Sequence, residues 1–306
     1  MTVVLTRSRV DSLVDAGLML EILRAGFRAP AADQPPLRVR TDLPGPGTAT
    51  CLMPGLLPGV PAYTVKVNAK FPDATPALRG VVCLHDLRSG ELLALADSSS
   101  VTSWRTGLAA ALGTHLLAAP DADTLGFVGA GAQAGKTLTG LRHLRRWRRI
   151  VACDLDPTRA TALTQHVVAD AAQVAADADV VVLATWSRRP LLHAGDVRPG
   201  QHLTTLGSDE PGKIELAGDL LRAARVVVDD LPLAARSGAL GNAGLDAAGA
   251  AGTLSEVIRG TLPARDGEQT VTVYAPIGLP WQDLAVTWAL YQRATAPDQI
   301  IIDLLS

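Results

Sequence analysis

Apolar and polar positions follow different periods in different parts of this chain. Between residues 8 and 29, apolar side chains recur at spacings of three and four, which predicts one or two amphipathic helices. Residues 37–43 and 62–70 instead alternate between apolar and polar positions, as strands do. Segments 80–86 and 91–96 flank a turn that ends in Gly90, which predicts a hairpin. The first hundred residues should therefore form a mostly antiparallel sheet preceded by one or two helices.

The alternating strands place charged side chains in defined positions. Arg38 and Arg40 share one face of the strand predicted at 37–43, and Lys66 lies on the polar face of the strand at 62–70. The Pro- and Gly-rich stretch 44–61 is predicted to be a loop. Thr102 or Ser103 is a candidate N-cap for a helix that runs through residue 117, so that Arg105 would lie in its first turn.

Beyond residue 120 the pattern changes to apolar strands that alternate with helices. Strands are predicted at 124–128, 150–153, 180–184, 202–206, 226–229 and 270–274, with helices at 133–147, 157–168 and 171–176. This alternation is typical of a parallel sheet covered by helices on both faces. The Gly/Ala-rich stretch 237–252 is predicted to be a loop, and 282–295 an amphipathic helix that returns to the first domain.

Composition excludes several classes of function. The 306 residues include 28 Lys and Arg against 30 Asp and Glu, so the net charge is −2 and no nucleic-acid partner is expected. The one dense basic run, from Arg142 to Arg149, fits a solvated helix end. Three cysteines lie far apart without paired spacing, which argues against a metal site. Without a signal peptide or a long apolar run, we expect a cytoplasmic protein with no membrane partner.

The most informative segment is the glycine turn, Gly129-Ala130-Gly131-Ala132-Gln133-Ala134. It spells G-x-G-x-x-A between a predicted strand and a predicted helix, the arrangement in which a helix N-terminus holds a dinucleotide pyrophosphate. The next strand ends in Asp154, where a carboxylate can bind the ribose hydroxyls and repel a 2′-phosphate. We therefore predict NAD as the cofactor, with NADP as the alternative.

Further motifs agree in order and spacing with one protein family. They are P-x-R at 36–38, Met-Pro at 53–54, Lys66, T-x-x-R-T at 102–106, the glycine turn, Ala-Thr at 184–185, G-x-D-x-P-G-K-x-E-L at 207–216 and I-G-L-P-W-Q-D at 277–283. Together they resemble the ornithine cyclodeaminase/mu-crystallin family over about residues 36–294. The resemblance implies a Rossmann-type doubly wound parallel sheet at 120–280, with an α+β substrate-binding and dimerisation domain at 1–119 and 281–306.

The resemblance also implies roles for individual residues. Arg38, Lys66 and Arg105 correspond to a cationic pocket for the substrate α-carboxylate, and a guanidinium suits a carboxylate because two parallel N–H groups can bind it. Simple exposure on a strand is the alternative for Arg38 and Lys66. The implied catalytic residues are Asp209, a base near the nicotinamide, and Lys66. The implied cofactor-binding residues are Thr106, Gly129, Gly131, Ala132, Gln133, Asp154, Thr185 and Lys213.

These roles predict an NAD(P)-dependent enzyme that acts on the Cα–N bond of a small amino acid. Cyclodeamination through an imine is the leading reading, with hydride passed to and from the nicotinamide. Cys51 stands where the cyclodeaminases carry an acid, which favours the alternative of an imine reductase or amino-acid dehydrogenase. A non-catalytic dinucleotide-dependent binding protein is the hypothesis of another class. The family's first domain pairs with its mate, so a homodimer is expected.

Overall fold

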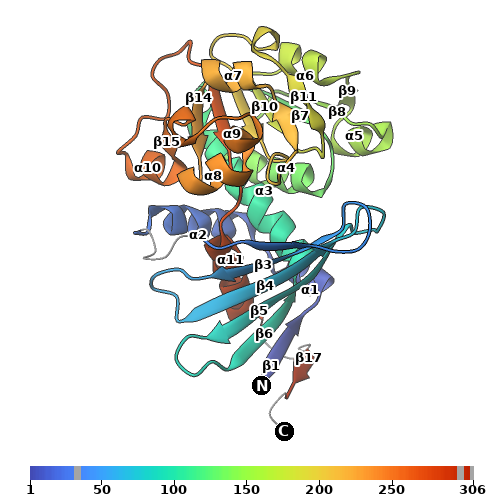
Figure 1. Ribbon diagram of the computed structural model, residues 1–306, viewed down its shortest axis with the longest axis vertical. Coiled ribbons are helices and arrows are strands. Elements are labelled where there is room, and N and C mark those ends of the chain that lie inside the picture. Colours follow the sequence, from blue (N-terminus) through green and yellow to red (C-terminus); the bar gives the residue numbers. More distant parts are fainter. Residues whose placement is uncertain (31–35, 295–299, 304–306) are drawn as a thin grey trace. The chain divides into compact units, whose positions relative to one another are not determined.

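The computed structural model describes residues 1–30, 36–294 and 300–303, and Figure 1 shows its helices and strands. The chain divides into two compact units. The first unit comprises residues 1–105 and 279–306, and the second unit comprises residues 106–278. The sequence predicts boundaries at 119/120 and 280/281. The compact units instead divide at 105/106, inside the long helix α3 (Ser98–Leu117), and at 278/279.

The first unit contains a seven-stranded sheet in the order β17-β1-β6-β5-β4-β3-β2. Strands β2 to β6 form antiparallel neighbours, whereas β1 pairs parallel with β6. The alternating segments and the hairpin are confirmed, and the terminal strands β1 and β17 are additions that the sequence pattern did not indicate. The strand bounds are β1 Thr2–Leu5, β2 Val39–Asp42, β3 Ala49–Gly55, β4 Ala62–Lys70, β5 Leu78–Asp86, β6 Leu92–Asp97 and β17 Ile300–Ile302.

Three helices complete the first unit, α1 (Arg7–Leu13), α2 (Ala16–Arg28) and α11 (Pro280–Arg293). Thr6 and Asp15 cap the first two through side-chain bonds to backbone N–H groups. Helix α11 packs on β3, β4 and β5 and also against α2, where the Trp281 ring meets Phe27 edge to face (Figure 1). A Cβ on Gly26 would lie 2.2 Å from the Trp281 ring, so only glycine permits this close approach.

Strand β4 buries its polar face. Thr64, Lys66 and Asn68 are buried beneath α11, while the intervening Val67 is 36% exposed. The exposed side chains of Val39, Leu52, Val67 and Val81 are paired from strand to strand across β2, β3, β4 and β5. We call these four side chains the apolar row. A strand with a polar core face and an apolar outer face reverses the usual pattern, and both faces therefore call for a functional explanation.

Two expectations for the first hundred residues are wrong. The predicted loop 44–61 contains β3, which pairs with β2 only over residues 49–52 and with β4 over its whole length. Pro54 therefore lies where β4 is the one neighbouring strand, so its missing N–H does not interrupt the hydrogen bonds to β2. Helix α3 begins at Ser98 rather than near residue 103, because Asp97 accepts a bond from the Ser100 N–H. Arg105 is therefore well inside the helix instead of in the first turn, where the sequence pattern placed it.

The second unit contains an eight-stranded sheet in the order β15-β14-β16-β12-β10-β7-β8-β9, in which every pair is parallel. This confirms the predicted α/β class. The strands are β7 Thr124–Val128, β8 Arg149–Cys153, β9 His166–Val167, β10 Val180–Leu183, β12 His202–Thr205, β14 Arg225–Val228, β15 Gly252–Thr253 and β16 Thr272–Ala275, with a separate pair, β11 Arg188–Leu192 and β13 Ile214–Leu216.

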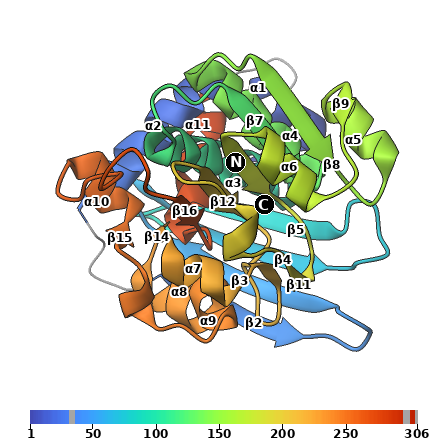
Figure 2. The same cartoon turned by 90° about the horizontal axis from the view of Figure 1, so that it is seen from above.

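Short helices accompany these strands, and Figure 2 shows α8 and α9 side by side. The predicted helix 157–168 ends at residue 163 and gives way to β9, and the predicted loop 237–252 contains α9 and a 3₁₀ turn, η2. The bounds are α4 Ala132–Leu144, α5 Pro157–Leu163, α6 Ala171–Asp177, η1 Ala194–Asp196, α7 Gly218–Ala223, α8 Leu231–Ser237, α9 Ala239–Asn242, η2 Ala247–Gly249 and α10 Leu254–Arg259. Among described helices, none is long and apolar enough to cross a membrane.

Strand order determines where a ligand can bind in the second unit. Strand β7 lies between β8 and β10, so the chain leaves β7 toward one edge of the sheet and later returns on its other side. In open parallel sheets, ligands bind beyond the carboxyl ends of the strands at such a reversal. The core beneath this point is apolar and fully buried, as Leu125, Phe127 and Val182 show.

Candidate functional site

The glycine turn begins at the carboxyl end of β7, at this reversal. Gly129 has a φ of 86°, and a Cβ there would lie 2.6 Å from the Ala184 carbonyl oxygen and 2.9 Å from the Thr185 side chain. The turn thus brings two predicted cofactor residues, Gly129 and Thr185, into contact. Gly131 differs, because an added Cβ would meet no atom within 4 Å. The space over Gly131 leaves its backbone open to a ligand.

Helix α4 presents an uncapped N-terminus at the same place. Its N-cap, Gly131, makes no side-chain capping bond, so the first-turn N–H groups of Ala132 and Gln133 are positioned for an external acceptor. The neighbouring α3 contributes Thr106, whose hydroxyl is buried without a hydrogen-bond partner. A Cβ on Gly107 would lie 2.7 Å from the Thr137 backbone nitrogen, which places this part of α3 against α4. An unpaired hydroxyl on α3 and open N–H groups at the start of α4, on two helices that are in contact, fit a phosphate.

Asp154 follows β8 and is bound to the glycine turn. One carboxylate oxygen accepts from the Ala130 N–H at 2.6 Å, and the other accepts from the Asp156 N–H at 2.8 Å. The side chain remains partly exposed, so its oxygens can accept further donors such as ribose hydroxyls. Arg159, the first basic residue after Asp154, forms an ion pair with Asp156. These contacts fit a dinucleotide with free 2′- and 3′-hydroxyls.

Glu215 joins the strand ends on the other side of β7. Its fully buried carboxylate accepts from the Thr185 N–H at 2.6 Å, the Thr185 hydroxyl at 2.8 Å, the Thr205 hydroxyl at 2.7 Å and the Gly207 N–H at 2.8 Å. Burial raises the pKa of Glu215, and these donors oppose that effect. Glu215 therefore holds the loops that follow β10 and β12 in fixed positions relative to each other.

Asp209, the predicted base, lies in the loop after β12 and is about one-third exposed. Its Oδ1 lies 2.9 Å from the Lys213 ammonium, which also lies 3.4 Å from Glu210. Burial lowers the pKa of Lys213, but Asp209 and Glu210 outweigh burial and raise it. The structure thus brings Asp209 and Lys213 together as an ion pair. The roles predicted for them, base and cofactor contact, stay predictions.

The first unit assembles what we call the α11 cluster, which consists of Lys66, Arg105, Gln282 and Asp283. Asp283 Oδ2 lies 2.7 Å from Lys66 Nζ, and its Oδ1 lies 3.2 Å from Arg105 Nε. Gln282 Oε1 accepts from Arg105 Nη1 at 3.2 Å. Because the side chains of Lys66 and Asp283 are each only 1% exposed, this is a buried charge network rather than a surface contact.

Charges in this cluster shift one another's protonation. The pKa of Lys66 is lowered to about 8, chiefly by burial and also by Arg105 and Arg38, while the adjacent Asp283 opposes this shift. Burial raises the pKa of Asp283, but Lys66 and Arg105 outweigh burial and leave it below its ordinary value. Lys66 is therefore protonated at neutral pH and loses its charge in mildly basic solution. The simple strand exposure considered for Lys66 is wrong.

Arg38 takes a different position from the one predicted. It directly precedes β2 instead of lying within it, so it does not share a strand face with Arg40, and its side chain is half-buried. Its positive charge nevertheless lowers the pKa of Lys66, which places the two side chains within electrostatic range. Arg38 thus belongs to the electrostatic surroundings of the α11 cluster.

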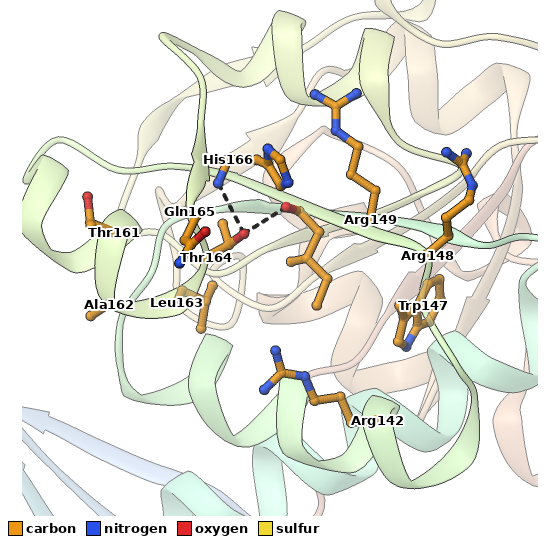
Figure 3. A pocket seen from close by; sticks show the side chains of 11 residues that line it. Arg142, Trp147, Arg148, Arg149, Thr161, Ala162, Leu163, Thr164, Gln165 and His166 are labelled. Atoms are coloured by element: carbon orange, nitrogen blue, oxygen red, sulfur yellow. Dashed lines mark hydrogen bonds between the residues drawn. The ribbon is translucent and has the colours of Figure 1, made fainter.

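A separate open pocket of about 440 Å³ lies in the second unit (Figure 3). Arg142, Arg149, His166 and neighbouring residues line it, at the ends of α4 and α5 that lie away from the glycine turn. Arg149 is paired with Asp177, and Arg148 with Asp123. Two arginines of this basic run thus form intrachain surface ion pairs, and Arg145 donates to the carbonyls of Ala119 and Ala122. In the described part of the chain, no group of three His, Cys, Asp or Glu side chains is placed to hold a metal ion.

Comparison with known proteins agrees with this geometry. The model of the ornithine cyclodeaminase/mu-crystallin family matches residues 1–298. The chain belongs to this family. Alanine dehydrogenase of Archaeoglobus fulgidus is 29% identical over 308 residues, which cover 96% of this chain and 95% of that protein. L-lysine cyclodeaminase of Streptomyces rapamycinicus is 32% identical over 248 residues, which cover 72% of this chain and 71% of that protein.

A solved structure supports the same assignment. The structure of an archaeal alanine dehydrogenase dimer with bound NAD matches this protein with a TM-score of 0.90 at 28% identity, and the match covers 99% of each chain. The doubly wound parallel sheet and the second α+β unit, both predicted from the sequence, are therefore confirmed as the architecture of this chain.

Sequence reasoning did not assign roles to three residues that the structure places at the centre of these contacts, Glu215, Gln282 and Asp283. Each had a detectable signal. Glu215 interrupts the apolar strand Ile214–Leu216, and Gln282 and Asp283 are adjacent polar residues in the first turn of α11, just before the apolar stretch 284–286. Ionisable side chains in apolar elements are rarely buried without partners. The sequence pattern could have indicated that these three side chains have buried hydrogen-bond or charge partners, but it could not identify those partners.

Proposed function

We propose that this protein is an NAD(P)-dependent enzyme that acts at the Cα–N bond of a small amino or imino acid. The observation that carries the proposal is the α11 cluster, in which Lys66 and Arg105 are held together by one buried aspartate. A buried cluster with excess positive charge is costly unless an anion is to be bound there. An α-carboxylate is an anion of suitable size and geometry for a lysine beside a guanidinium.

The contacts of the second unit support a dinucleotide cofactor. The first turn of α4 and the Thr106 hydroxyl would hold the pyrophosphate, and Asp154 would hold the ribose hydroxyls. When bound, NAD would take a hydride from Cα of an amino acid, or return one to an imine. We propose NAD rather than NADP, because the Asp154 carboxylate would repel a 2′-phosphate.

The protein's own groups would supply binding, orientation and proton transfer. Lys66 and Arg105 would bind the carboxylate and so present one face of Cα. As an amino acid is oxidised, its Cα–H bond is lost as hydride, a C=N bond forms, and the nitrogen gives up one proton. Asp209, a partly exposed carboxylate after β12, is the proposed acceptor of that proton.

Two outcomes can follow the imine, and each has support. Net oxidation or reduction is favoured by the half-buried Cys51 on β3, in place of the acid that the family's cyclodeaminases carry, and by the similarity to alanine dehydrogenase. Ring closure with loss of ammonia is favoured by Asp209, which could orient a side-chain amine of the substrate, and by the similarity to L-lysine cyclodeaminase.

A pair of assays separates these outcomes. In the first, L-ornithine or L-lysine is supplied with catalytic NAD and ammonia is measured. In the second, L-alanine with NAD, or a cyclic imino acid with stoichiometric NADH, is followed at the nicotinamide absorbance. Ammonia release without net NADH would establish cyclodeamination, and stoichiometric change in NADH alone would establish an oxidoreductase. Saturable ligand binding without turnover in either assay would contradict the enzymatic proposal and favour the binding protein.

We also propose that the protein is a homodimer formed through the outer face of the first unit's sheet. The apolar row leaves four large aliphatic side chains 36–42% exposed in register on neighbouring strands, and contiguous apolar surface of this kind is unusual in monomers. The structurally similar archaeal alanine dehydrogenase is a dimer. Sedimentation analysis tests the proposal, since a monomer at micromolar concentration would exclude it.

A further inference from the structure

Gln282 has an amide group whose two ends have different surroundings. Its Oε1 accepts from Arg105 Nη1 at 3.2 Å and from the Leu279 N–H at 3.3 Å. Because two donors face this atom, it must be the oxygen, and the orientation of the amide is thereby settled. The NH₂ group therefore points away from both of these donors.

That NH₂ group is buried, and it has no acceptor among the described residues. Gln282 as a whole is 1% exposed. Buried donors in native proteins are almost always paired, and an unpaired one calls for an explanation such as a bound ligand. By contrast, Gln201, another buried glutamine, donates from Nε2 to the carbonyls of Ala175 and Ala178, each at 2.7 Å. The NH₂ of Gln282 thus differs from that of Gln201, which two carbonyls pair.

The groups beside Gln282 have donors in excess. Lys66 carries three N–H donors and Arg105 carries five. Asp283 accepts one from each, Gln282 accepts one from Arg105, and the Thr102 hydroxyl accepts one from Lys66 at 3.5 Å. The remaining donors of the two cations and the Gln282 NH₂ share one small region without a matching number of acceptors. Their chemical complement is a group with acceptor oxygens only, and a carboxylate is such a group.

We propose that Gln282 is a substrate-binding residue whose side-chain NH₂ donates to the carboxylate of the amino or imino acid held by Lys66 and Arg105. The inference rests on the proposed function and adds to it a specificity for the ionised acid. A primary carboxamide in place of the carboxylate would bring its own NH₂ against an array of donors, so amino-acid amides are excluded as substrates.

Two variants test the inference. Gln282→Glu keeps an oxygen on Arg105 and replaces the NH₂ with an acceptor, and Gln282→Met removes both polar atoms at similar volume. Losing a hydrogen bond to a charged group should raise the KM for the amino acid by about 10- to 100-fold in Gln282→Met, with kcat changed much less. Gln282→Glu should raise KM further, because a carboxylate would then face a carboxylate.

The matched control is Gln201→Met, which removes a buried amide that is already paired. It should lower Tm and leave KM for the amino acid unchanged. A Gln282→Met or Gln282→Glu protein with lower Tm and wild-type KM would overturn the inference, since the amide would then be structural only. Failure of the proposed function looks different: the wild-type protein would neither turn over nor be stabilised by L-alanine, L-lysine or a cyclic imino acid in the presence of NAD(H).

Discussion

Replacing Asp283 with asparagine tests the electrostatic design of the α11 cluster. The variant keeps the size and shape of the side chain but removes the negative charge that both Lys66 and Arg105 contact. The asparagine oxygen can accept from one of the two cations, and its NH₂ then faces the other. Two buried positive charges are left with no compensating anion in the α11 cluster.

The expected loss of stability follows from burial. Lys66 and Asp283 are each 1% exposed and their charged atoms lie 2.7 Å apart. Removing one partner of a buried ion pair costs about 3–5 kcal/mol, because the other charge stays desolvated and unpaired. This is a large part of the roughly 5–15 kcal/mol that separates native from unfolded proteins. We therefore expect Asp283→Asn to lower the free energy of unfolding by about 3–5 kcal/mol at pH 7.

The loss should depend on pH in a defined direction. The pKa of Lys66 falls from 10.5 to about 8 on folding, chiefly through burial. Between these values the unfolded chain binds more protons than the folded chain, so this group makes the protein more stable as pH rises from about 8 to 10.5. Asp283 raises the pKa of Lys66, so the rise should begin at a lower pH in the variant. The penalty of the mutation should thus shrink between pH 7 and pH 9.5.

Urea unfolding at pH 7 and pH 9.5 measures both effects, with Asp123→Asn as the control. Asp123 pairs with Arg148 on the surface, where screening leaves little net attraction, so that variant should unfold like the wild type. An equal loss of stability for Asp283→Asn at the two pH values would refute the assignment of charge to Lys66. Substrate affinity provides a second measurement, since the wild-type KM should rise as pH increases through about 8 and Lys66 loses its proton.

Three further predictions concern the other features of the chain. Asp154→Ser should raise the KM for NADH by about tenfold, which is the effect of losing one charge-assisted hydrogen bond, and should weaken discrimination against NADPH. An unchanged ratio of the KM values for NADH and NADPH would show that Asp154 does not select the cofactor. Glu215→Gln would turn an NH₂ toward a donor such as the Gly207 N–H. Thermal unfolding should then show a free energy of unfolding lower by about 1–3 kcal/mol, and the KM for the cofactor should rise. Wild-type values for both quantities would refute the positioning role of Glu215. Val67→Glu places a charge in the centre of the apolar row and should give monomers in sedimentation without lowering Tm at high dilution, whereas a persistent dimer would place the interface elsewhere.

Local pattern predicted the second unit well. Its strands are short, continuous apolar runs because both faces of a parallel sheet are covered, and this signal is independent of the rest of the chain. The position of Gly129 was predictable from local pattern too, since a turn from strand to helix needs glycine wherever φ is positive. Helix ends were less well placed: the chain after residue 163 pairs with β8 as β9, and this pairing overrides the helical period.

The first unit shows what a local pattern leaves open. Alternation predicted the two faces of β4 correctly, but it could not show that the polar face is the buried one, because α11 lies far away in sequence. Stretch 44–61 read as a loop from its prolines and glycines, yet β2 and β4 pair with its central residues and make them a strand. Asp97, rather than Thr102 or Ser103, caps α3.

By itself, the sequence determined the fold class and the place of the glycine turn, and it offered Lys66 and Arg105 as candidate cations, because each depends on residue type and short-range spacing. Only the tertiary structure decided how those cations are held. Asp283 lies 217 residues beyond Lys66, and no periodicity links them. The Lys66 charge would need no partner in water, but α11 buries it, and a buried charge is destabilising unless an opposite charge pairs with it.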